Sequence, residues 1–215
     1  MTCIASTCTR ELRDHEIASA QLLCDPCLHR MRGWLQSIPA QLFVLREGSM
    51  QREVGGGGRT GTRTAPLPGR LDTLNLVGPA AAGTVVDPHG DQTGDMPIAG
   101  VLSSWVLLIA EERPARLPQR QTEEALADWL IPHLGWSSQQ PWSGELHDEL
   151  HGMMRAIWGI TALQPRTRAI SRPCPRCDRL ELSRTDGDQY TRCGFCGTSY
   201  TTQELNDDAE RRAAA

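Results

Sequence analysis

The stretch PCPRCDRLELSRTDGDQYTRCGFCG, residues 173–197, decides how the C-terminal part of this 215-residue chain folds. It contains two Cys-x2-Cys pairs with fifteen residues between them: Cys174 and Cys177, then Cys193 and Cys196. Each pair presents two thiolates to one ion, and zinc takes four such ligands at the corners of a tetrahedron. Four thiolates leave no position open for a substrate, so the spacing predicts a structural zinc ion.

The residues between the two pairs predict a β-hairpin. Leu180 and Leu182 alternate with polar residues, the Asp-Gly-Asp sequence at 186–188 favours a turn, and residues 190–191 favour a returning strand. This pattern is typical of a zinc ribbon, which we place at residues 166–205. The alternatives are a reduced thiol cluster without metal and a redox pair.

A second cluster of four cysteines lies near the N-terminus: Cys3, Cys8, Cys24 and Cys27. Its first pair has the wider Cys-x4-Cys spacing, and fifteen residues again separate the pairs. Apolar residues recur at helical spacing after the second pair: Leu28, Met31, Leu35 and Ile38. A zinc knuckle (a short turn that carries two cysteine ligands), a hairpin and a helix that ends before Pro39 predict a treble-clef-like zinc finger at residues 1–47. We therefore expect two structural zinc ions.

Between the clusters, the sequence predicts a flexible linker and a small helical domain. Residues 48–70 are rich in Gly, Pro and Thr and have no apolar periodicity, as expected for a linker. The helical domain spans residues 71–165, and three of its segments read as helices: residues 98–112, 122–134 and 143–160. Thr122 and Ser143 are candidate N-caps. With a disordered tail at 206–215, the predicted fold class is α+β, mainly α.

Charge is unevenly distributed along the chain. The net charge is −4 and there is no lysine, so all 22 basic residues are arginine. Residues 1–70 and 164–196 each carry +3, whereas residues 71–163 carry −8. Guanidinium groups match the geometry of phosphate, so the cysteine-rich ends suit an anionic partner. The pI near 5.9 argues the other way, since nucleic-acid-binding domains often exceed about 9.

The leading functional hypothesis is a zinc-dependent nucleic-acid-binding or transcription-regulatory accessory protein. Arginine on a small zinc module is a usual way to hold phosphate. The arginines assigned to this role are Arg168, Arg172, Arg176, Arg179, Arg184 and Arg192. The alternative is a protein-interaction adaptor, in which the zinc modules dock onto a partner. The acidic middle segment and the long linker suit that alternative.

An enzyme is a third hypothesis. His15 near Cys24 is similar to the arrangement in His-Asn-His nucleases, but no Asn lies in this module to complete a catalytic metal site. His147 and His151 lie one helical turn apart without the HExxH pattern, and a solvated helix face explains them. The oxygen-rich loop at 87–95 lacks the spacing of a calcium-binding loop. We therefore predict no catalytic residues.

The sequence also predicts a cytoplasmic protein without a membrane segment. No basic stretch followed by an apolar region marks a secretory signal at the N-terminus. The longest apolar run, residues 98–110, is interrupted by Gly100, Ser103 and Ser104 and is shorter than the roughly 20 residues that span a bilayer. Disulfides are rare in the cytosol, where clustered cysteines more often bind metal.

Several long motifs resemble a family of uncharacterised OvmZ-like proteins from high-GC bacteria and their phages. The motifs are LCDPCLHRMRGWLQSIP at 23–39, DPHGDQTGDMPIAGVLSSW at 87–105, WSGELHDELH at 142–151, and PCPRC and CGFCG around the C-terminal cluster. The resemblance covers most of the chain. It implies that the segments form one functional unit and that zinc binding is expected. It implies no catalytic residues.

Overall fold

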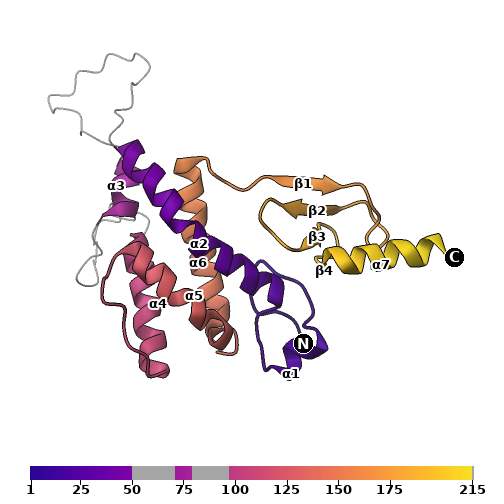
Figure 1. The fold of residues 1–215 in the computed structure, drawn as a ribbon, viewed down its shortest axis with the longest axis horizontal. Helices are drawn as coiled ribbons and strands as arrows, with labels where there is room; N and C mark the ends of the chain where they lie inside the picture. Colours follow the sequence, from indigo (N-terminus) through magenta and orange to yellow (C-terminus); the bar gives the residue numbers. More distant parts are fainter. Residues whose placement is uncertain (50–70, 79–96, 215) are drawn as a thin grey trace, which may run out of the picture. The chain divides into compact units, whose positions relative to one another are not determined.

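The computed structural model describes residues 1–49, 71–78 and 97–214. The predicted linker at 48–70, apart from its first two residues, and the loop at 87–95 lie outside the described residues. The helices of the described part are α1 (Asp14–Ala18), α2 (Asp25–Ser49), α3 (Leu71–Val77), α4 (Ile98–Glu112), α5 (Glu123–Ser137), α6 (Ser143–Thr161) and α7 (Thr202–Ala213). The strands are β1 (Thr167–Ile170), β2 (Leu182–Thr185), β3 (Thr191–Cys193) and β4 (Ser199–Tyr200). This mainly helical α+β architecture confirms the predicted class (Figure 1).

The chain divides into two compact units, and neither is continuous in sequence. The cysteine unit comprises Met1–Leu35, Ile131–His151 and Gln164–Ala215, and the helical unit comprises Gln36–Leu130 and Gly152–Leu163. Helices α2, α5 and α6 each contribute to both units. The second half of α5 and the first half of α6, which lie within the predicted domain at 71–165, belong to the cysteine unit.

The helix α2 does not end before Pro39, as its sequence predicts, but continues to Ser49. A proline inside a helix removes one backbone hydrogen bond and costs about 3 kcal/mol. Here the apolar stripe continues past the proline, since Leu42 and Leu45 are both buried. Burial of two such side chains contributes roughly 1.5–3 kcal/mol each, which is enough to offset the cost.

The other predicted helices agree closely with the structure. The helix α4 has the predicted bounds, and Ile98, Leu102 and Ile109 are fully buried on it. Thr122 caps α5, because its hydroxyl accepts a hydrogen bond from the Ala125 N–H at 3.3 Å. Ser143 is the first residue of α6 and its hydroxyl has no partner among the described residues, so it is not the predicted N-cap. No helix of the described ranges is both long and apolar enough to span a membrane.

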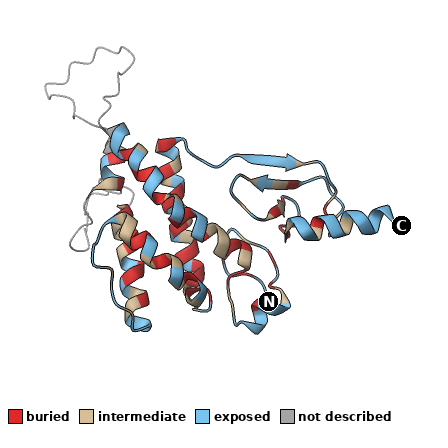
Figure 2. Ribbon diagram, viewed as in Figure 1, coloured by how far each residue is buried: buried red, intermediate tan, exposed pale blue. Residues whose placement is uncertain are grey.

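The four strands form one antiparallel sheet in the order β1-β2-β3-β4. The predicted hairpin is formed by β2 and β3, and Gly187 takes a φ of 83° in the turn between them. Strand β1 is mostly exposed (Figure 2). The small core of this module consists of Cys174, Leu182, Cys193, Tyr200 and Leu205. Two of these five residues are predicted metal ligands.

The segment 206–213 is helical, where the sequence analysis assigns a disordered tail. The helix α7 begins with a capping box, in which Thr201 accepts from the Glu204 N–H and Glu204 accepts from the Thr201 N–H. Leu205 then buries its side chain in the core of the C-terminal module. A cap and one buried apolar anchor are sufficient to order a helix that otherwise carries mainly polar residues.

Candidate metal centres

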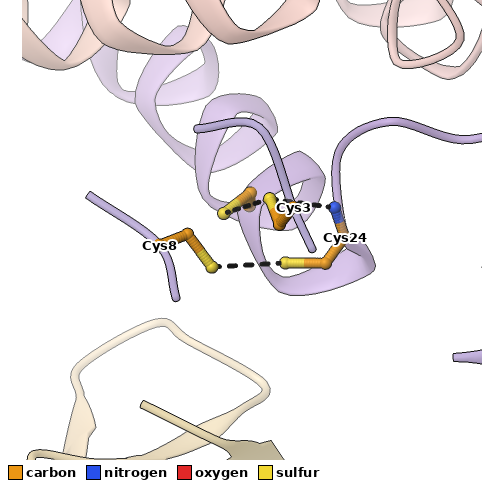
Figure 3. Close-up of side chains that lie close together, drawn as sticks. Cys3, Cys8 and Cys24 are labelled. Atoms are coloured by element: carbon orange, nitrogen blue, oxygen red, sulfur yellow. Dashed lines mark hydrogen bonds between the residues drawn. The ribbon is translucent and has the colours of Figure 1, made fainter. Parts of the chain in front are cut away.

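The N-terminal cluster brings its four cysteines together, as their spacing predicts (Figure 3). The Sγ atoms of Cys3 and Cys27 lie 3.8 Å apart, and those of Cys8 and Cys24 are also 3.8 Å apart. All four Sγ atoms lie within 4.8 Å of one another. Cys8 is half-buried and the other three are buried. The N-terminal segment before α1, which carries Cys3 and Cys8, and the start of α2 thus direct four thiolates toward one point.

The C-terminal cluster has the same form. The Sγ atoms of Cys174 and Cys196 lie 3.6 Å apart, and those of Cys177 and Cys193 lie 3.7 Å apart. With zinc–sulfur bonds of about 2.3 Å, the edges of a regular tetrahedron are about 3.8 Å long. A disulfide would need its sulfur atoms about 2.05 Å apart, and all eight cysteines are free. Both clusters are therefore suited to hold one metal ion each.

Two arginines, the buried Arg10 and the half-buried Arg30, compensate the charge of the N-terminal cluster. Four thiolates around a divalent ion carry a net charge of −2. The guanidinium of Arg30 donates a hydrogen bond to the Cys27 sulfur at 3.0 Å. Burial would lower the pKa of Arg30, but the charge of Cys27 raises it. Burial would likewise lower the pKa of Arg10, but Glu16 and Cys24 raise it. The two cations neutralise the site and favour the fully thiolate form that a metal ion requires.

No sequence pattern marks Glu16, yet its carboxylate organises the N-terminal cluster. One oxygen accepts hydrogen bonds from the Arg10 guanidinium and from the Asp25 N–H, both at 2.7 Å, and the other accepts from the Arg13 N–H at 2.6 Å. Glu16 is fully buried, and burial would raise its pKa, but Arg10 and the two N–H donors lower it. Because Asp25 follows Cys24 directly, Glu16 fixes the turn that carries the second cysteine pair.

A tyrosine supports the C-terminal cluster. The Tyr200 hydroxyl lies 3.4 Å from the Cys174 sulfur. Burial raises the pKa of Cys174, but the Tyr200 hydroxyl and nearby backbone N–H groups outweigh burial and lower it to about 6. Burial and the same contact raise the pKa of Tyr200, so the phenol stays protonated and donates its hydrogen bond to the thiolate. Sequence spacing carries no signal for this contact.

His147 is buried in the cysteine unit, where the sequence analysis expects a solvated helix face. Its ring packs against Trp34 at a centroid distance of 5.2 Å, and its Nδ1 lies 2.8 Å from the Asp148 carboxylate. Asp148 in turn accepts hydrogen bonds from the Ser6 N–H at 3.2 and 3.3 Å. This chain of contacts ties α6 to the loop between Cys3 and Cys8. The buried face of α6 therefore includes His147 as well as Leu146 and Leu150.

The burial of His147 leads to a prediction on acid stability. Burial lowers the pKa of His147, although Asp148 acts in the opposite direction. The unfolded chain therefore binds a proton below about pH 6.5 that the folded chain does not, and stability falls as the pH decreases. We expect His147→Gln to flatten the dependence of unfolding free energy on pH between 7 and 5, by at most about 1.4 kcal/mol per pH unit. Urea unfolding at a series of pH values with metal in excess measures this, and equal slopes in both proteins would contradict it.

The two cysteine modules contact each other within the cysteine unit. The Arg13 guanidinium pairs with the Glu204 carboxylate at 2.6 Å and donates to the Ser199 carbonyl at 3.2 Å. Arg192 donates to the Thr7 carbonyl at 3.1 Å. A side chain at Gly197, which has a φ of 70°, would collide with the Thr9 hydroxyl. The close approach of Thr9 explains why glycine stands after the last cysteine. The contacts of Arg13 and Arg192 join residues far apart in sequence.

His15, the residue considered for a nuclease site, belongs to a third group of possible metal ligands, together with Glu16 and Asp25. His15 and Asp25 form a 2.8 Å contact next to Glu16, and the three could hold an ion by distance alone. However, the Glu16 carboxylate already accepts three hydrogen bonds from the protein. The cluster therefore lacks a free buried ligand, and it lends no support to a nuclease site.

The six arginines assigned to phosphate binding all lie in the C-terminal module, and each has a partner within the protein. Arg168 pairs with Asp186 at 3.2 Å, and Arg184 donates to the Asp188 carbonyl at 2.9 Å. Arg172 contacts Asn206, and Arg176 contacts Glu11. Arg179 lies over the Phe195 ring, and Arg192 donates to the Thr7 carbonyl. The two ion pairs among these contacts, Arg168 with Asp186 and Arg176 with Glu11, are exposed and are worth at most about 1 kcal/mol each.

No protein-family model matches the sequence, and searches of curated proteins and of solved structures find no match. The fold and the two sites nevertheless define a class. This is a mainly helical chain with two four-cysteine sites, each suited to a structural metal ion.

Proposed function

We propose that this protein is a zinc-dependent nucleic-acid-binding module whose two metal ions are structural. Four thiolates in a closed tetrahedron are the usual environment of structural zinc, and they leave no ligand position for a substrate. The short sheet of the C-terminal module has too small an apolar core to fold without its metal-bound cysteines. Zinc would thus build the surface that binds the partner.

The observation that carries the nucleic-acid proposal is a pair of like charges on the sheet. Arg168 and Arg184 stand directly opposite each other on β1 and β2. Two cations in this position repel each other and destabilise the sheet. Arg168 is largely exposed, with 75% of its side chain accessible, and its ion pair with Asp186 is a surface contact. A bound phosphate would relieve the repulsion and would gain two guanidinium donors.

A binding experiment tests the proposal. We expect a fluorescently labelled oligonucleotide to bind the zinc-loaded protein at 50 mM salt, with affinity that decreases steeply toward 300 mM. Replacing both Arg168 and Arg184 by alanine should reduce the slope of log K against log salt by about 1 for each phosphate that the variant no longer neutralises. Arg46→Ala, a change on the helical unit, is the matched control and should leave the slope unchanged. Absence of binding to single strand and duplex at low salt would refute the proposal.

A second candidate is a protein-interaction adaptor. Phe43 on α2 and Leu107 on α4 expose 68% and 57% of their surface in the helical unit. The segment 71–163, which supplies much of that unit, carries a net charge of −8. Exposed apolar side chains on an acidic background suit a protein partner rather than a nucleic acid. A partner that co-purifies after nuclease treatment, and that is lost on Phe43→Ala or Leu107→Ala, would support this role.

The role in transcription regulation, the cytoplasmic location and the membership of the OvmZ-like family are further parts of this proposal. They are supported by the sequence motifs and by the cysteine chemistry.

A further inference from the structure

An exposed aromatic ring lies between the last two metal ligands of the C-terminal module. Phe195 is 57% exposed, and it stands between Cys193 and Cys196 in the second knuckle. The guanidinium of Arg179, which follows the first knuckle, lies 3.5 Å from the centroid of the Phe195 ring. The two knuckles thus present a stacked pair of flat groups at the surface.

This stack differs from the other arginine contacts of the module. Within the described residues, no carboxylate pairs with Arg179, and its side-chain partner is the aromatic ring. Leu180, the next residue in the sequence, is also exposed, at 72%. We call the surface formed by Arg179, Leu180 and Phe195 the knuckle patch. An exposed aromatic ring beside a cation that has no carboxylate partner would match a ligand with a flat face and a negative charge.

A nucleobase with its phosphate has this combination of properties. Bases stack on exposed aromatic rings and on guanidinium planes, and the stacking tolerates any sequence because every base has a π face. The neighbouring arginine Arg176 has half of its side chain exposed and is held by a 3.7 Å contact with Glu11 and a 3.3 Å hydrogen bond to the Thr198 hydroxyl, so it could exchange Glu11 for the adjoining phosphate. The bases of an intact duplex are already stacked on each other, so a duplex cannot offer a free face. The patch therefore fits a single strand.

The metal site gives this patch its rigidity. Phe195 is flanked by ligands of the same ion, and Cys177 lies two residues before Arg179. A ring held by two ligands loses little conformational freedom when a ligand binds, which favours affinity. We propose that the knuckle patch binds single-stranded nucleic acid by stacking one base on Phe195. This inference rests on the nucleic-acid-binding function proposed above and specifies its partner.

One carboxylate near the patch opposes this binding. A side chain placed on Gly194 would lie 3.5 Å from an Oε atom of Glu181, so this carboxylate stands beside the second knuckle. Its charge would repel a phosphate of the bound strand. We expect Glu181→Gln to increase the affinity for a single strand at low salt by up to about fivefold. Unchanged affinity would place the strand elsewhere.

The deciding experiment compares two single strands of equal length and charge, one with bases and one abasic, against the zinc-loaded full chain. We expect wild-type protein to bind the base-bearing strand about 5- to 150-fold more tightly, and Phe195→Ala to abolish that difference while it retains the salt-dependent binding of the abasic strand. Phe43→Ala is the matched control, since Phe43 and Phe195 are the only two phenylalanines of the chain and both are exposed. Zinc content of two per chain verifies that each variant is folded.

The outcomes separate this inference from the function on which it rests. Equal affinity for both strands in wild type, or no effect of Phe195→Ala, would overturn base stacking and leave phosphate binding in place. No binding of either strand would overturn the nucleic-acid function itself. Capture of an apolar protein segment that depends on Phe195, with no strand bound, would identify a protein as the occupant of the patch.

NMR signals of the phenylalanine rings provide an independent test of base stacking on Phe195. Because the chain has two phenylalanines, ring-labelled protein gives two sets of aromatic signals. On addition of the base-bearing strand, the signals of Phe195 should shift upfield through the ring current of the stacked base, while those of Phe43 remain in place. Unchanged Phe195 signals in a saturated complex would contradict the inference.

Discussion

Cys193→Ser should remove one of two bound metal ions and unfold the C-terminal module. Cys193 is fully buried and belongs both to β3 and to the core that Leu182, Tyr200 and Leu205 complete. A structural zinc site contributes about 10–16 kcal/mol in small zinc-dependent peptides, which exceeds the stability of most small domains. Three remaining thiolates would bind the ion far more weakly, and three apolar side chains would not hold the sheet together.

Metal content and amide hydrogen exchange measure this result. We expect the metal content to fall from two equivalents to one and the exchange protection to disappear across β2, β3 and β4. The helices of the helical unit should retain their protection, because their core contains none of the eight cysteines. Ser183→Ala, a change on β2 that touches no ligand, is the control. A variant that keeps two ions and full protection would show that the sheet does not depend on metal.

Glu16→Ala should destabilise the N-terminal cluster nearly as strongly, although Glu16 is not a metal ligand. The substitution leaves the nearly inaccessible Arg10 cation without its carboxylate and removes the acceptor of the Arg13 and Asp25 N–H groups. Breaking a buried ion pair by removing one partner costs about 3–5 kcal/mol. We also expect weaker metal binding, since the turn after Cys24 loses its anchor.

The chain offers a matched control for this substitution. Glu11 lies in the same loop, but its side chain is 67% exposed and its contact with Arg176 is 3.7 Å long. Glu11→Ala should change the unfolding free energy by less than about 1 kcal/mol. Guanidinium-induced unfolding and competition with a chromophoric chelator compare the two variants. If both variants were equally stable, the buried pair would have no structural role.

The helices illustrate how far local sequence patterns reach. The bounds of α4 follow from its mainly apolar run, and the cap of α5 follows from Thr122, because periodicity and capping act over a few residues. The continuation of α2 past Pro39 does not follow from local rules. It depends on the burial of Leu42 and Leu45, which only the packed helical unit supplies.

The same distinction applies to the six arginines of the C-terminal module. Their number and their proximity to the cysteines can be read from the sequence. Which of them stands opposite another cation, and which lies on an aromatic ring, depends on strand register and on the folding of the two knuckles. Arg168 faces Arg184 through pairing across β1 and β2, whereas Arg179 reaches Phe195 across the metal site.

By itself, the sequence determined the two four-cysteine clusters, because each pair of ligands lies in one short turn and spacing alone brings its thiolates together. The tertiary structure decided what surrounds those clusters. No sequence pattern predicted the hydrogen bonds of Glu16, the burial of His147 or the pairing of Arg13 with Glu204. Arg13 and Glu204 lie 191 residues apart, and no periodicity spans that distance. Such contacts arise only when the whole chain has packed, since burial then selects which polar groups must pair.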